Sequence, residues 1–226
     1  MDVRRLTGMA GVAWVVVTGV GVTFFSLTGN PPDFGNAAAF AAYISGSSTS
    51  FLVDAFTTGL SAALLGLFVA GLSALVADAG SDGRLPATGL LALGVVVAGM
   101  LAVVGTLETA TVIVASAKAY AGLVAPFFLV TQLAVVFLYF PGAGFLAVLG
   151  QNAARLALPS WIAWTARGAA VLVAIASLAV FGGTGSFGPL GLIQVLVGFL
   201  PSALTFLVIA VHLLRNTHAS AIALTE

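Results

Sequence analysis

The sequence predicts an all-α protein, a polytopic bundle of about six transmembrane helices. Hydrophobic residues fill 61% of the 226 positions and charged residues only 6%, whereas a soluble domain carries roughly 25% charged residues because its surface faces water. The mean hydropathy is +1.19. The apolar residues also fall into separate runs of about 20 or more, the length that a helix needs to cross a bilayer core of ~30 Å. Lipid is therefore the solvent that this chain requires.

Each apolar run is expected to be a helix, because lipid-facing backbone groups must be satisfied within their own segment. The first run follows two arginines, but it is longer than the apolar part of a signal peptide, so we interpret it as a retained helix. The fourth run ends at Phe140 or, as an alternative, continues past Pro141 to Gly150. The single transmembrane domain, residues 1–226, is predicted to have spans at 6–27, 51–77, 87–111, 120–140, 161–181 and 190–214.

Basic residues predict the orientation of the spans. The side of the bundle with both termini carries six arginines, whereas Lys118 alone falls on the other side. An excess of Lys and Arg marks the cytoplasmic face, so the N-terminus and the C-terminus are both predicted to be cytoplasmic. Three of the arginines are also candidate contacts for anionic lipid headgroups, although a role in topology would by itself explain them. These three are Arg84, Arg155 and Arg167, and the others are Arg4, Arg5 and Arg215.

The longest outer loop, residues 30–50, contains a candidate short helix. Asn36 is a suitable N-cap, and Phe40, Tyr43 and Ile44 would share one face at helical spacing. We expect such a helix at the membrane interface, either on the outer surface or closed over the mouth of the bundle. An ordinary interfacial connector is the simpler alternative.

Small residues in the second span predict a helix-packing face. Ala62, Gly66, Ala70 and Ala74 recur every four residues, a pattern that lets another helix approach closely. The face serves either internal packing of the bundle or, as the sharper hypothesis, docking of another subunit.

Polar residues inside the spans predict a candidate pocket in the outer half of the bundle. Asp54, Glu108, Gln132 and Gln194 would line it, with Glu108 as its main charge. A charge at mid-bilayer costs about 2.5–3.5 kcal/mol on insertion scales, so such groups are usually paired, turned inward or in contact with water. The alternative is that Glu108 pairs with Lys118, that Asp54 faces outer water, and that the two amides join helices.

The sequence offers no recognisable catalytic motif. It contains no cysteine, and its two histidines, His212 and His218, both fall at the inner end of the chain, so no metal-ligand spacing is present. A net charge of zero gives no basic field to attract nucleic acid. We therefore predict no enzyme activity, no catalytic, cofactor-binding or metal-binding residues, no cofactor and no nucleic-acid partner.

The segment Leu158-Pro-Ser-Trp161-Ile-Ala-Trp164 follows a short basic loop and leads into an apolar span. With the arginine-led first span and the longer first outer loop, it resembles an uncharacterised family of small bacterial six-helix membrane proteins, which usually have a basic residue where Ser160 stands here. The resemblance implies a six-helix plan and no known activity. Six arginines among seven basic residues, with abundant alanine, glycine and valine, suggest a GC-rich genome of actinobacterial type.

Three functions from different classes remain, in the following order. The first is a non-catalytic packing or accessory subunit of a larger membrane assembly, with membrane lipids, other membrane subunits or itself as partners. The second is a binder or carrier of a lipid or small apolar molecule through an outward-facing pocket around Glu108. The third is an ion-coupled transporter, which needs a charge at the midplane, where only Gln132 is expected. The predicted location is the bacterial inner membrane.

Overall fold

The computed structural model describes residues 2–181 and 194–222, without the side chains of Ser81, Lys118 and residues 217–222. Every regular element in these ranges is a helix, and six helical segments are long and apolar enough to cross a membrane. This confirms the predicted fold class and makes the chain a multi-pass membrane protein. The long helices are α1 (Val3–Ser26), α3 (Ser48–Asp78), α4 (Arg84–Ser116), α5 (Ala121–Gln151), α6 (Ser160–Ser177, continued by η3, Leu178–Phe181) and α7 (Leu200–Ile222, preceded by η4, Gln194–Phe199).

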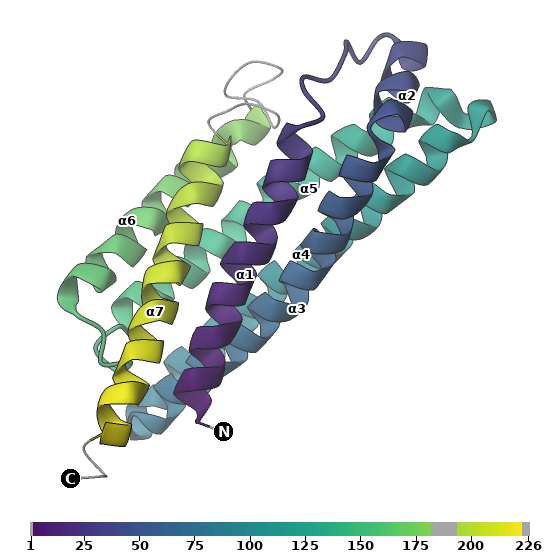
Figure 1. Cartoon of the computed structure of the whole chain (residues 1–226). Coiled ribbons are helices and arrows are strands. Elements are labelled where there is room, and N and C mark those ends of the chain that lie inside the picture. The colour runs from purple at the N-terminus through teal and green to yellow at the C-terminus, as the bar shows by residue number, and fades with distance from the viewer. Residues whose placement is uncertain (1, 182–193, 223–226) are drawn as a thin grey trace.

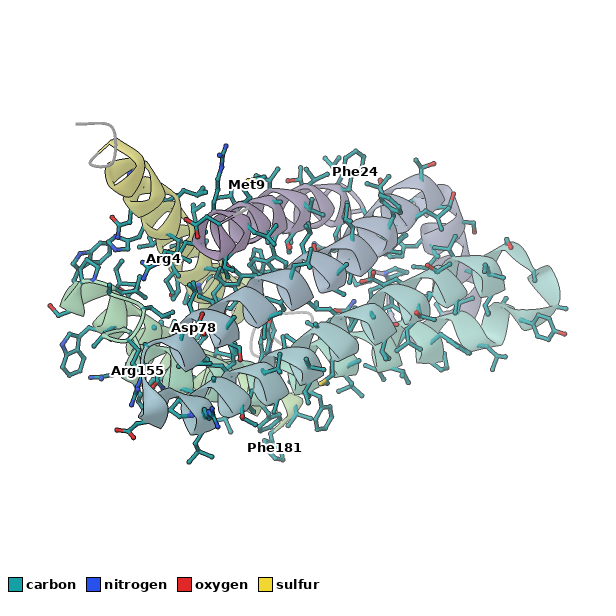
Figure 2. The ribbon with its side chains drawn as sticks, turned by 90° about the horizontal axis from the view of Figure 1, so that it is seen from below. Arg4, Met9, Phe24, Asp78, Arg155 and Phe181 are labelled. Carbon is teal, nitrogen blue, oxygen red and sulfur yellow. The ribbon has the colours of Figure 1, made fainter. Side chains whose placement is uncertain are left out.

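The six long helices run alternately up and down and form a closed ring (Figure 1). Each packs against its neighbours in chain order, and α7 closes the ring against α1. Both termini lie at one end of the bundle, which we name the terminal end, and the short helix α2 (Ala37–Gly46) lies at the opposite, distal end (Figure 1). Arg4, Asp78 and Arg155 come from separate segments and gather at the terminal end (Figure 2). That this end faces the cytoplasm stays a prediction.

The fourth span continues through its prolines. Helix α5 contains both Pro126 and Pro141 and ends only at Gln151, so the longer alternative describes this segment. Proline removes one helical hydrogen bond, but neighbouring helices and local adjustments compensate for this inside transmembrane bundles. The extension matters because the residues after Pro141 line the interior of the ring.

Helix α2 covers the distal end of the ring on the side of α3, α4 and α5. The Asn36 side chain caps it by accepting a hydrogen bond from the Ala39 amide at 3.0 Å, and the helix packs against α5, α4 and α3. Phe40 and Ile44 are fully buried. Their aromatic neighbours form the distal aromatic cluster, which consists of Phe25, Phe34, Phe40, Tyr43, Phe51 and Phe128.

Tyr43 ties α2 to the end of α1. Its hydroxyl shares a 2.9 Å hydrogen bond with the Thr28 hydroxyl and lies 3.2 Å from the Gly29 carbonyl, to which it donates. Burial raises the pKa of the Tyr43 phenol above its ordinary value of 10.0, and the bond to Thr28 offsets part of this rise. The phenol therefore remains neutral, and remains a donor, throughout the physiological pH range.

We expect Phe40→Ala to loosen the distal end without unfolding the bundle, because Phe40 packs against Phe34, Tyr43 and Phe128. The chain has no cysteine, so Thr111→Cys, beneath the cluster and 2% exposed, gives a clean probe. A small water-soluble thiol reagent should label this cysteine several times faster in the Phe40→Ala background.

The control is Phe56→Ala, which truncates an exposed phenylalanine on the outside of α3 and should leave the labelling rate unchanged. Equal rates in all three backgrounds would show that α2 does not close the distal end.

Candidate functional site

The ring encloses two adjoining cavities. The polar cavity, about 210 Å³, lies in the distal half and is lined by residues of α1, α3, α4, α5 and η4. The apolar cavity, about 120 Å³, lies deeper and is lined by residues of all six spans. Four wall residues belong to both cavities, and they are Leu101, Val135, Tyr139 and Phe199. The two spaces therefore meet on the axis of the ring.

All four residues of the predicted pocket line the polar cavity. Asp54 comes from α3, Glu108 from α4, Gln132 from α5 and Gln194 from η4. The first three lie at comparable depth, since each is 6 to 11 residues from the distal end of its helix, or roughly 9–17 Å at 1.5 Å per residue. Equal depth on neighbouring spans brings them to one space.

The burial of these side chains shows whether Asp54 lines the pocket or faces outer water. Asp54 and Gln132 are each 8% exposed and Gln194 is 5% exposed. Asp54 therefore does not face outer water, which corrects the alternative expectation. The alternative also expected Glu108 to pair with Lys118, and the side chain of Lys118 lies outside the described part of the structure.

Two carboxylates share the polar cavity without a described basic partner. Asp54 and Glu108 are close enough for their charges to repel, and the Thr58 hydroxyl offers Glu108 a hydrogen bond. Where the structure describes side chains, neither carboxylate has a cationic neighbour. An uncompensated carboxylate within a membrane span is costly, so intramembrane acidic residues usually mark a functional site.

Gly21 of α1 makes room for this acidic pair. A Cβ at Gly21 would lie 2.8 Å from Asp54 Oδ1 and would overlap Thr57 Oγ1. The missing side chain thus allows α1 to cover Asp54 from one side. In the terminal half of the ring, Gly8 and Gly11 bring α1 against α7, while Gly11 and Thr7 also contact Phe68 and Gly71 of α3.

The unpaired buried polar atoms of the polar cavity's lining residues are acceptors, whereas Trp14, which lines the apolar cavity, has an unpaired Nε1 donor. Glu108 Oε2 and Gln194 Oε1 are both buried, and each lacks a hydrogen-bond partner. The Gln194 amide nitrogen is already used, because Nε2 donates to the Ala176 carbonyl at 3.1 Å. Leaving a buried polar atom unpaired costs about 1–3 kcal/mol. The polar cavity therefore holds unpaired acceptors, with the Gln132 amide as a donor group in the same lining.

Tyr139 and Gly198 belong to the site, although the sequence analysis did not select them. The Tyr139 hydroxyl donates to the backbone carbonyl of Gln194 at 3.3 Å, and a Cβ at Gly198 would overlap the Tyr139 ring. These contacts hold η4, a π-helical turn, against α5. Pro201 follows η4 and has no N–H to donate to the Val197 carbonyl. This proline was the one signal in the sequence that could have indicated an irregular helical turn here.

Aromatic side chains close the apolar cavity towards the terminal end. Phe206 lies at the centre of this terminal aromatic cluster, with ring centroids 5.1 Å from Trp14, 5.4 Å from Phe68 and 5.7 Å from Phe145. Aromatic clusters thus lie at both ends of the joined cavities. On the side, Val195 lines the polar cavity and is 43% exposed to the membrane-facing surface.

Most of the predicted packing face of α3 does not pack inside the bundle. Of its four residues only Ala62 is buried, Gly66 has open space where a Cβ would stand, and Ala70 and Ala74 are exposed. Internal packing therefore describes Ala62 and not the rest of this face. Whether another subunit covers it stays a prediction.

The predicted headgroup contacts lie at the terminal end, away from the cavities. Arg84 and Arg167 are exposed and Arg155 is partly exposed. The Arg167 guanidinium lies 5.0 Å from the centre of the Trp164 ring, and Trp161 and Trp164 are exposed at the start of α6. This arrangement is compatible with an interfacial belt.

The described residues hold no group of three or more His, Asp or Glu side chains that could bind a metal ion. The chain matches no protein-family model, no curated protein and no solved structure.

Proposed function

We propose that this membrane protein binds, and carries within the membrane, a small amphipathic molecule in its axial cavities. One observation carries the proposal: four polar side chains from four helical segments line one cavity of about 210 Å³, and two of their acceptor atoms are buried without a partner. Pockets for small molecules are typically mostly apolar with a few convergent polar groups. Here the polar groups converge at one end, and an apolar space adjoins them.

This proposal places the second of the sequence-based hypotheses before the first. An accessory subunit requires no internal cavity. Gln194 does join two helical segments, because its Nε2 donates to the Ala176 carbonyl of α6, but its Oε1 has no partner. The exposed small-residue face of α3 supports the subunit hypothesis and is compatible with both. We also propose a bacterial inner membrane location with the distal end outside, on the strength of the arginines at the terminal end.

The test is gentle extraction of the tagged protein from its native membrane, followed by native mass spectrometry. We expect the wild type to retain a defined small molecule and Glu108→Gln to lose it, because the substitution removes the charge but keeps the size of the side chain. The matched control is Asp78→Asn, which changes an exposed carboxylate at the terminal end of α3 and should keep the molecule.

A second outcome would reverse the order of the hypotheses. A stoichiometric protein partner whose binding is lost in Ala70→Leu, together with an empty cavity in both wild type and Glu108→Gln, would support the accessory subunit and contradict the proposal.

A further inference from the structure

We propose that the molecule is a primary alkylamine or a close analogue, with its ammonium group in the polar cavity and its hydrocarbon chain in the apolar cavity. The inference rests on the proposed function and adds the chemical class of the head group and the position of the tail.

The pattern of satisfied and unsatisfied atoms indicates a donor head group. Glu108 Oε2 and Gln194 Oε1 are acceptors without a partner. The Tyr139 hydroxyl bonds to Gln194 O, and Gln194 Nε2 bonds to Ala176 O, so the Gln132 amide is the remaining amide donor in the lining. An ammonium group has three N–H donors and no acceptor, so its hydrogen-bonding capacity matches unpaired acceptors. A carboxylate or phosphate head would bring more acceptors and more negative charge to a site that already holds two carboxylates.

The charge of the cavity indicates a cation. Asp54 and Glu108 face one space, and their charges repel across it. No described basic side chain balances them. A monocation between two carboxylates relieves the repulsion and forms charge-assisted hydrogen bonds, which are roughly twice as strong as neutral ones.

The adjoining apolar cavity indicates a tail. Its lining residues are hydrocarbon and aromatic apart from Thr18, Ser202, the Tyr139 hydroxyl and the Trp14 indole N–H, which has no partner. The hydroxyls of Thr18 and Ser202 already hydrogen-bond to Trp14 O and Gly198 O. An apolar cavity of about 150 Å³ is large enough to hold benzene. The 120 Å³ cavity is therefore suited to a short alkyl segment, and the terminal aromatic cluster limits its length.

A tryptophan at the terminal end of the apolar cavity can report where the alkyl tail lies. Trp14 lines the cavity, whereas the other two tryptophans, Trp161 and Trp164, are exposed near the terminal end. Replacing both exposed tryptophans by phenylalanine leaves Trp14 as the single tryptophan of the chain. A bromine at the end of an alkyl chain quenches an indole only on close contact, so quenching reports where the tail lies.

The experiment uses this variant in nanodiscs of zwitterionic phosphatidylcholine and three probes of equal length: ω-bromo-octylamine, ω-bromo-octanol and ω-bromo-octanoate. We expect saturable quenching of Trp14 by the amine alone. Glu108→Gln should lower the affinity for ω-bromo-octylamine by about tenfold to a hundredfold, the range expected for loss of a hydrogen bond to a charged group. Unbrominated octylamine should reverse the quenching and raise the unfolding temperature.

A second variant tests the position of the tail. A Cβ at Gly142 would make only ordinary contact with Val173, at 3.8 Å, and Gly142 lines the apolar cavity. Gly142→Leu should fill the cavity and abolish quenching by ω-bromo-octylamine. The matched control is Gly122→Leu on the same helix, where nothing lies within 4 Å, and it should be quenched like the parent.

The outcomes separate this inference from the proposed function. Saturable quenching by the alcohol or the carboxylate in place of the amine would overturn the head-group assignment and leave a binding cavity. If octylamine stabilises the protein in a Glu108-dependent way but ω-bromo-octylamine does not quench Trp14, the assigned position of the tail is wrong. Stabilisation by sodium or calcium ions alone would show a cation site without a tail. Absence of saturable binding by every probe would contradict both proposals.

Discussion

Gly94→Leu is expected to lower the free energy of unfolding by about 3 kcal/mol, at the upper end of the range for overpacked cores. Gly94 is buried on α4 where it faces α3, and a Cβ there would overlap both methyl groups of Val69. Val69 is itself 1% exposed, and the free space beside these two residues is the apolar cavity that both of them line. Close helix contact through small residues is the main source of helix association in membranes, and the substitution removes that contact.

Gly99→Leu on the same helix is the matched control. Gly99 is exposed, and nothing lies within 4 Å of the position of its Cβ, so a leucine there should face lipid with little effect on stability. The midpoint of unfolding of the detergent-solubilised protein in a denaturant titration measures both variants.

A rescue variant identifies the clash as the cause. Adding Val69→Ala to Gly94→Leu should recover part of the lost stability, whereas Val69→Ala alone should destabilise by leaving a cavity. Equal midpoints for Gly94→Leu and Gly99→Leu would contradict the close approach of α3 and α4.

Depth in the membrane could be predicted from the sequence, because it depends only on counting along each span. In this way Asp54 and Glu108 were assigned to the outer half of the bundle and Gln132 to near the middle of its span, and the structure brings all three, with Gln194, to one cavity. The same counting predicts that the arginines gather at the opposite end. Six apolar runs and short connections leave few other arrangements for these residues.

The rotation of each helix about its axis could not be predicted in the same way. The small residues on α3 do not indicate which face of the helix points into the bundle. Lipid and the protein interior are both apolar, so a hydrophobic stripe can face either of them. The face with Ala70 and Ala74 therefore looked like a packing face but is exposed, while Leu65, Phe68 and Leu72 are buried.

The apolar cavity was also hidden from sequence analysis. Its wall combines residues from all six spans, and no single span carries a pattern that indicates empty space beside it. A cavity is a property of how side chains of different helices fail to fill a volume, so it emerges only once the rotations and crossing points are set.

Phe206→Ala is expected to destabilise the bundle by about 2 kcal/mol, less than the 3–5 kcal/mol typical of soluble cores. Phe206 is 5% exposed and contacts three aromatic rings of the terminal cluster. In the membrane, lipid solvates the phenyl group of the unfolded state, so little transfer free energy is lost and the loss of contacts to Trp14, Phe68 and Phe145 remains. A denaturant titration measures the difference in the free energy of unfolding. Phe56→Ala, which truncates an exposed ring, should change that free energy by less than about 0.5 kcal/mol.

The same variant provides a chemical rescue. Phe206 lines the apolar cavity, so its truncation should enlarge that cavity by the volume of a phenyl ring, and apolar cavities of this kind bind benzene. Benzene should therefore raise the midpoint of Phe206→Ala more than that of the wild type or of Phe56→Ala, because only that variant gains a matching space. An equal effect of benzene on all three proteins would mean that the bundle collapses into the space left by the ring, and the terminal aromatic cluster would then be too soft to close the apolar cavity.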